Sequence, residues 1–204
     1  MGRPQLYSQD EILDAARQLV LEGGARSATL NAIAESSGAP KGSIYHRFAS
    51  LAELLAEMWI RAVQRSQNDF IDALAQPDPM TAAIAGALSI YDFAQREPAD
   101  AQLLASLRRE DLIDSVGAPG LQRRLAEVNR PLEAALAELA RRLFGRATRD
   151  AIERTVSAVV DIPIGMTRRY LMAQSPFPRT LREQIAAAVH AALLEAGARP
   201  TMPD

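Results

Sequence analysis

Hydrogen-bond donors gather in residues 41–47, KGSIYHR, and their chemistry suits contact with DNA. The cations at both ends can neutralise phosphates or reach guanine, and the hydroxyl groups and the imidazole can meet phosphates or base edges. The glycine allows a duplex to approach closely. The candidate contact residues in this stretch are Lys41, Gly42, Ser43, Tyr45, His46 and Arg47.

The charge of this stretch differs from the charge of the whole chain. The 204 residues carry 23 basic and 25 acidic side chains, and the formal net charge is −2. Taken alone, that balance argues against wholesale binding of nucleic acid, which needs clustered positive charge. However, no acidic residue lies between Ser36 and Ala52, and the single lysine of the chain, Lys41, falls inside this interval. The average therefore conceals a locally positive segment.

Two short helices joined by a turn are predicted to position these residues. Thr29 is expected to cap a helix that ends before Gly38, and the next helix should run from Pro40 to about Phe48. A positive φ is expected in the turn at Gly38, where glycine carries no steric penalty. The apolar faces of the pair come from Leu30, Ile33, Ile44 and Phe48. Residues 29–48 thus predict a helix-turn-helix.

The rest of the chain also has helical periodicity and no convincing strand pattern, which predicts an all-α fold of about nine helices. A capping box of Ser8 and Glu11 should start the first helix, and Gly23 should supply its left-handed exit. A long fourth helix follows Ser50 and ends near Leu74. Later helices are expected at about 79–96, 99–115, 119–144, 147–173 and 179–196, with kinks or breaks at Pro131 and Pro163.

Several classes of function are excluded or disfavoured. The chain has no cysteine and only two histidines, far apart in the sequence, so we predict no disulfide and no metal site. No nucleophile elbow or glycine-rich phosphate loop occurs, and we expect neither an enzyme nor a bound cofactor. Because no apolar run approaches the roughly 18 residues of a membrane span and the N-terminus lacks the apolar stretch of a signal peptide, we expect a cytoplasmic protein without membrane contact.

Residues 8–68 resemble the DNA-binding domain of the TetR (tetracycline-repressor) family of bacterial regulators, and the segment GAPKGSIYHRF carries most of the likeness. The resemblance implies an N-terminal three-helix DNA-binding domain at 8–68 and a larger C-terminal regulatory, ligand-binding and dimerisation domain at 69–204. It places the third helix in the major groove and adds Thr29 and Asn31 to the DNA contacts.

Two positions depart from the family pattern. Pro40 stands where a serine or threonine often precedes the lysine, and Leu51 stands where a lysine often holds a phosphate. We therefore expect one fewer contact with the DNA phosphates, unless Arg3 or Arg26 supplies it. The resemblance predicts a homodimeric repressor that a small molecule releases from a palindromic operator in double-stranded DNA.

The C-terminal half carries little motif signal. Its last two predicted helices have broad apolar faces, which in the family pair across a two-fold axis, although an intramolecular core explains any single residue equally well. A ligand pocket is expected between residues 55 and 175, lined by aromatic residues, a methionine and one acid near the prolines. The candidates are Trp59, Tyr91, Phe93, Asp161, Met166 and Tyr170.

Each of these candidates has a plainer explanation. Large side chains at helical spacing are ordinary core residues, and Asp161 can form an ion pair with an arginine. For the chain as a whole, the alternative is a helical adaptor or ligand-binding protein whose helix-turn-helix is vestigial.

Overall fold

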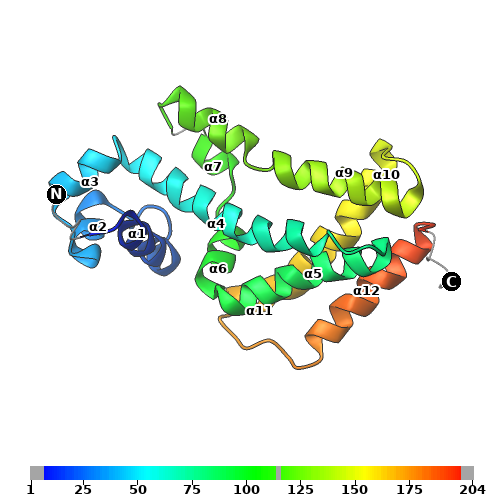
Figure 1. The fold of residues 1–204 in the computed structure, drawn as a ribbon. Helices are drawn as coiled ribbons and strands as arrows, with labels where there is room; N and C mark the ends of the chain where they lie inside the picture. The colour runs from blue at the N-terminus through cyan, green and yellow to red at the C-terminus, as the bar shows by residue number, and fades with distance from the viewer. Residues whose placement is uncertain (1–6, 114–115, 199–204) are drawn as a thin grey trace, which may run out of the picture. The chain divides into compact units, whose positions relative to one another are not determined.

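The computed structural model describes residues 7–113 and 116–198, and every regular element in these ranges is helical (Figure 1). The all-α prediction is confirmed. The chain forms two compact units: in the described ranges, unit 1 comprises residues 7–63, 102–113 and 116–128, and unit 2 comprises residues 64–101 and 129–198. None of the helices in these ranges has the length and apolar composition needed to cross a membrane.

Unit 1 begins with three helices, α1 (Gln9–Gly23), α2 (Leu30–Ser37) and α3 (Lys41–Arg47), and continues into the long α4 (Leu51–Ala73). The predicted capping box forms at the start of α1. The backbone N–H of Ser8 donates to the Glu11 carboxylate at 2.7 Å, and the backbone N–H of Glu11 donates to Ser8 Oγ at 3.1 Å. The predicted exit is wrong by one residue: Gly23 is still helical, so the positive φ, 76°, falls on Gly24.

The core of unit 1 joins the N-terminal helices to shorter ones later in the chain. These are α6 (Pro98–Ser106), which begins in unit 2, α7 (Glu110–Ile113) and α8 (Pro119–Glu127). The core residues are almost fully buried, and they include Ile12, Ala16, Ile33, Ile44, Leu54, Met58, Leu103 and Leu125. Unit 1 is therefore assembled from segments that are far apart in the sequence.

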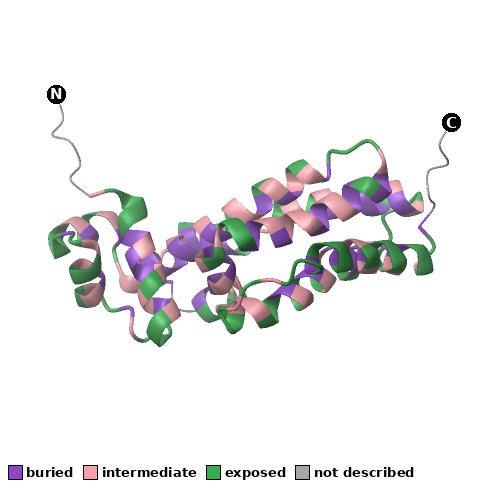
Figure 2. Ribbon diagram, turned by 90° about the horizontal axis from the view of Figure 1, so that it is seen from below, coloured by how far each residue is buried: buried purple, intermediate pink, exposed green. Residues whose placement is uncertain are grey.

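Unit 2 is built around α5 (Pro79–Arg96), which packs against α9 (Arg130–Phe144), α11 (Ile162–Met172) and α12 (Leu181–Glu195). Figure 2 shows the buried positions as purple bands along the helices. Its fully buried residues include Leu139, Leu143, Val159, Leu181, Ile185, Val189 and Leu193. Four of these, Val159, Ile185, Val189 and Leu193, lie on the faces that the sequence left open to either a core or a partner, and they belong to the core.

Within the described ranges the structure has twelve α-helices and one π-helical segment, because some of the expected helices are divided. The expected helix at 99–115 is divided into α6 and α7. The next one breaks before Pro131, which lies in the first turn of α9. Before Pro163 the helix continues, because a π segment (Ser157–Asp161) joins α10 (Arg149–Val156) to α11 and the backbone N–H of Ile162 donates to the Ser157 carbonyl. The wider π turn accommodates the missing N–H of the proline.

Candidate nucleic-acid interface

The helix-turn-helix forms with the local geometry that the sequence predicts. Thr29 caps α2 because its Oγ1 accepts the backbone N–H of Ala32 at 3.2 Å. Gly38 ends α2 in the left-handed region, with φ 68° and ψ 0°. Helix α3 follows at Lys41. Ile44 and Phe48 are only 1% and 3% exposed, so this face of α3 packs into the core of unit 1.

The predicted contact residues lie mainly on the opposite, solvent-exposed surface. Ser43 and Arg47 are half-buried, and Tyr45 is 57% exposed, which is unusual for so large an apolar side chain. The exposed members of the set are Thr29, Asn31, Lys41, Gly42, Tyr45 and His46. The arrangement offers a cation, two hydroxyl groups, an amide and an imidazole to a ligand surface, with no acidic side chain on α3. Of the two spare cations considered above, Arg26 is exposed and Arg3 lies outside the described residues.

Arg47 differs from the other predicted contacts because its guanidinium is bound inside unit 1. Its Nη2 donates to the Tyr7 carbonyl at 2.7 Å, and its Nη1 donates to the Ser43 carbonyl at 3.2 Å. Tyr7 immediately precedes the capping box of α1. Arg47 therefore ties the C-terminal end of α3 to the segment that starts α1.

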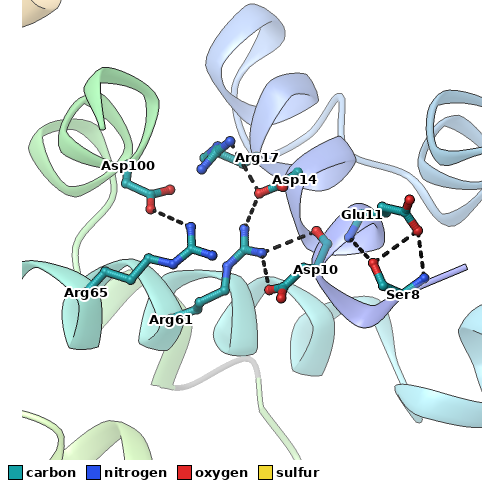
Figure 3. A network of polar contacts seen from close by, with 8 residues as sticks. All are labelled: Ser8, Asp10, Glu11, Asp14, Arg17, Arg61, Arg65 and Asp100. Carbon is teal, nitrogen blue, oxygen red and sulfur yellow. Dashed lines mark hydrogen bonds and ion pairs between the residues drawn. The ribbon is translucent and has the colours of Figure 1, made fainter. Parts of the chain in front are cut away.

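A second arginine, which the sequence analysis did not single out, ties α4 to the same part of α1 (Figure 3). Arg61 Nη1 lies 2.7 Å from Asp10 Oδ1, and Arg61 Nη2 lies 2.5 Å from Asp14 Oδ1. Arg17 adds a second cation 3.3 Å from the same Asp14 oxygen. In the capping box beside them, hydrogen bonds from the backbone and then the side chain of Ser8 hold the pKa of Glu11 below its usual value.

Three of the predicted ligand residues share the core of unit 2. The ring of Tyr91 lies 5.2 Å from that of Phe177, and the ring of Tyr170 lies 5.8 Å from it on another side. Met166 is half-buried and packs on the same core. The sequence analysis missed Phe177, because its neighbours Pro176 and Pro178 indicate only a loop.

The other three candidates have different surroundings. Phe93 is buried on α5. Trp59 belongs to unit 1, where its indole Nε1 donates to the Leu107 carbonyl at 3.0 Å. Asp161 lies in the π segment and is exposed to solvent.

Comparison with known proteins agrees with this geometry. Residues 12–58 match the family model described as bacterial regulatory proteins, tetR family. The HTH-type transcriptional repressor KstR2 of Mycobacterium tuberculosis H37Rv is 36% identical over 73 residues, which cover 33% of this chain and 35% of the relative. The likeness of sequence to the tetR family thus covers only part of the chain, including the helix-turn-helix. The match spans about a third of the length of this curated relative.

Solved TetR-like structures extend the likeness of the fold to nearly the whole chain. The fatty acid degradation regulator FadR from Bacillus halodurans superposes with a TM-score of 0.72 at 17% identity, covering 98% of this chain and 100% of that one. The TetR-family regulator PfmR from Thermus thermophilus has a TM-score of 0.69 at 20% identity, with 90% and 97% covered. FadR from Bacillus subtilis, solved with stearoyl-CoA, has a TM-score of 0.69 at 13% identity, with 91% and 98% covered. Identities this low establish the TetR fold alone. The named relatives are regulators, which agrees with the prediction that the chain is not an enzyme.

Proposed function

We propose that this chain is a TetR-family regulator: a homodimeric repressor that binds a palindromic operator and leaves it when a small molecule binds. The observation that carries the proposal is the exposed, acid-free face of α3 on a fully formed helix-turn-helix. We assign DNA contacts to Lys41, Gly42, Ser43, Tyr45 and His46 on α3, and to Thr29 and Asn31 at the start of α2. Lys41 supplies a phosphate contact, and the hydroxyl, amide and imidazole groups meet phosphates and base edges.

Exposed apolar side chains on the last two helices support the homodimer. Ile164 and Met172 on α11 are 44% and 46% exposed, and Leu194 on α12 is 41% exposed. Burying them against a second copy removes apolar area from water. A two-fold dimer presents two α3 helices to two half-sites one DNA turn apart, and the operator is then a palindrome. Such an operator places the protein in the cytoplasm.

The effector site is proposed in the C-terminal regulatory part of the chain, for which we keep the sequence boundary at residue 69. Tyr91, Met166 and Tyr170, together with Phe177, are the candidate ligand residues that share one core, and buried Phe93 is kept as a fifth. Because Bacillus subtilis FadR shares the fold and was solved with stearoyl-CoA, acyl-CoA thioesters are the first probes to try. Release requires that the ligand binds the two states of the dimer with affinities that differ by about 1–3 kcal/mol.

DNA binding is tested by selecting bound sequences from random duplex DNA with the full chain and then titrating the selected duplex at several salt concentrations. Lys41→Ala and Tyr45→Ala should each weaken binding about tenfold or more, with little change in melting temperature because both side chains are exposed. For Lys41→Ala, the slope of log K against log salt should fall by about 0.9, the value for one phosphate contact. A ligand-free dimer that selects no duplex at low salt would instead support the adaptor alternative.

The effector step is tested by a thermal-shift screen with acyl-CoA thioesters of increasing chain length. A ligand at 100 times its Kd adds about 2.7 kcal/mol of stability per site. The same ligand should release the dimer from the selected duplex. A thioester that binds tightly but leaves affinity for the duplex unchanged would refute the release step while leaving DNA binding intact.

A further inference from the structure

The N-terminal end of α1 is held from two sides within unit 1. Arg47 reaches it from the end of α3 through the carbonyl of Tyr7, just before the helix, and Arg61 reaches it from α4 through Asp10 and Asp14. We propose that Arg47 and Arg61 are positioning residues for operator binding, which fix α3 relative to α4 through the N-terminal end of α1. The inference rests on the proposed function, because it assigns Arg47 a role other than the DNA contact that the sequence suggests.

The two hydrogen bonds of Arg47 suit a structural role. A planar guanidinium can hold two acceptors at once, whereas a lysine ammonium is a point charge on a flexible stem. Here the two acceptors are the carbonyls of Tyr7 and Ser43, one outside α3 and one a turn earlier within it. A phosphate ligand needs charge and exposure, but this guanidinium is half-buried and already donates one N–H from each terminal nitrogen to a carbonyl.

Helix α3 needs such an external link. It has only seven residues, and its N-cap is Pro40, which makes no side-chain capping bond. Helices this short are marginal by themselves, so tertiary contacts set their position. Ile44 fixes the buried face, and Arg47 fixes the end that faces α1.

Arg61 supplies the corresponding link to α4. Its side chain is 13% exposed and lies against the carboxylates of Asp10 and Asp14, one helical turn apart on α1. Removing its charge leaves two carboxylates on that face with less compensation. The capping box of Ser8 and Glu11 stiffens the start of α1, which lies between the contacts of the two arginines. A shift of α4 would therefore move Tyr7 and, through Arg47, α3.

The first experiment separates positioning by Arg47 from phosphate contact. Arg47→Lys keeps the charge but loses the guanidinium that binds two acceptors at once, and Arg47→Ala loses both. If Arg47 positions α3, both variants weaken binding of the selected duplex about tenfold. On random duplex, the salt slope of Arg47→Ala should match the wild type, whereas the control Lys41→Ala loses about 0.9 of the slope. Wild-type affinity in Arg47→Lys, or a fall of about 0.9 in the slope of Arg47→Ala, would overturn the assignment.

The second experiment tests whether the two arginines act through the same turn. Arg61→Gln alone should weaken the selected complex, and Arg61→Lys should restore part of the loss. In combination with Arg47→Lys, Arg61→Gln should add little further loss, because either change already frees the turn. Arg61→Gln with Tyr45→Ala, the matched control pair, should multiply the two separate losses. If the losses of affinity from the two arginine substitutions multiply, the proposal that both residues act through the same part of α1 is wrong.

Circular dichroism at the binding temperature confirms that each variant is folded, and the conservative Arg47→Lys variant keeps the test available if Arg47→Ala unfolds. The outcomes for the two proposals are distinct. If the wild type binds no duplex, the proposed function fails and this inference with it. If the wild type binds and the arginine variants bind equally well, only this inference fails.

Discussion

Both units have an apolar core, but the two short helices of the helix-turn-helix depend more on local polar bonds than the long helices of unit 2 do. In unit 1, α2 and α3 have eight and seven residues, and they are fixed by the Thr29 cap, the left-handed Gly38 and the arginine links. In unit 2, α5 has eighteen residues and α12 has fifteen, and long rows of fully buried apolar side chains hold them together.

This difference corresponds to different demands on the two units. Directional hydrogen bonds and ion pairs fix the angle of a short helix, and a helix that reads a duplex needs a defined angle. An apolar core is non-directional and tolerates changes of side chain when volume is preserved. The core of unit 2 should therefore tolerate substitutions more readily than the polar bonds that hold α2 and α3.

Removing the buried anchor of α3 should have the largest effect. Ile44 is 1% exposed, so Ile44→Ala should lower the free energy of unfolding by about 2–5 kcal/mol. If the units unfold separately, the loss should appear in the transition of unit 1, and Ile185→Ala should affect only that of unit 2. Urea denaturation followed by circular dichroism checks this, with Tyr45→Ala as the exposed control. Equal shifts of both transitions by Ile44→Ala would show that the units unfold as one.

A smaller effect is expected at Gly86 on α5, which lies against the side chain of Leu74, the residue that follows α4. A Cβ at Gly86 on α5 would lie 2.6 Å from Leu74 Cδ2, and Leu74 is itself buried. Gly86→Ala should therefore destabilise the chain by about 1–3 kcal/mol through overpacking. Gly120→Ala on α8 meets no atom within 4 Å and serves as the control. A Gly86→Ala variant as stable as the wild type would show that the core of unit 2 accommodates the added methyl group without loss of stability.

The cap of α2 tests the importance of local polar bonds in unit 1. Thr29→Ala removes the acceptor for the Ala32 N–H and should cost about 0.5–2 kcal/mol of stability. It should also weaken DNA binding, because Thr29 is a proposed contact. Thr29→Ser keeps the oxygen and should recover most of the stability. A Thr29→Ser variant that is as unstable as Thr29→Ala would point to the methyl group instead of the cap.

Local signals explain how much of this architecture is predictable from sequence. Ser8, Thr29 and Gly38 act within a few residues of their own positions, so the helix-turn-helix and its exposed face follow from the sequence. The break at Pro131 follows from the missing N–H. The links from Arg61 to Asp10 and from Arg47 to Tyr7 span 51 and 40 positions, and no local pattern encodes such pairs. For the same reason, the contact of Phe177 with Tyr91 and Tyr170 emerges only in the folded unit.

The smallest expected effect is an acid dependence that distinguishes the caps of the two units. In unit 1 hydrogen bonds from Ser8 hold the pKa of Glu11 below its usual 4.5, and in unit 2 hydrogen bonds from the side chain and backbone of Thr81 hold the pKa of Asp78 below 3.8. Because each folded-state pKa is lowered, the unfolded chain binds more protons in acid. The stabilisation is complete above the ordinary pKa and is lost as the pH falls through the lowered one.

With Glu11→Gln, the free energy of unfolding of unit 1 should therefore fall less steeply as the pH drops below about 4.5. With Asp78→Asn, the free energy of unfolding of unit 2 should fall less steeply below about pH 3.8. Urea titrations between neutral pH and pH 3 measure both. The two residues cap different helices, so each variant should leave the other transition unchanged. If Glu11→Gln flattened both transitions equally, the first turn of α1 would be coupled to the whole chain, and the separation of polar links in unit 1 from apolar packing in unit 2 would not hold.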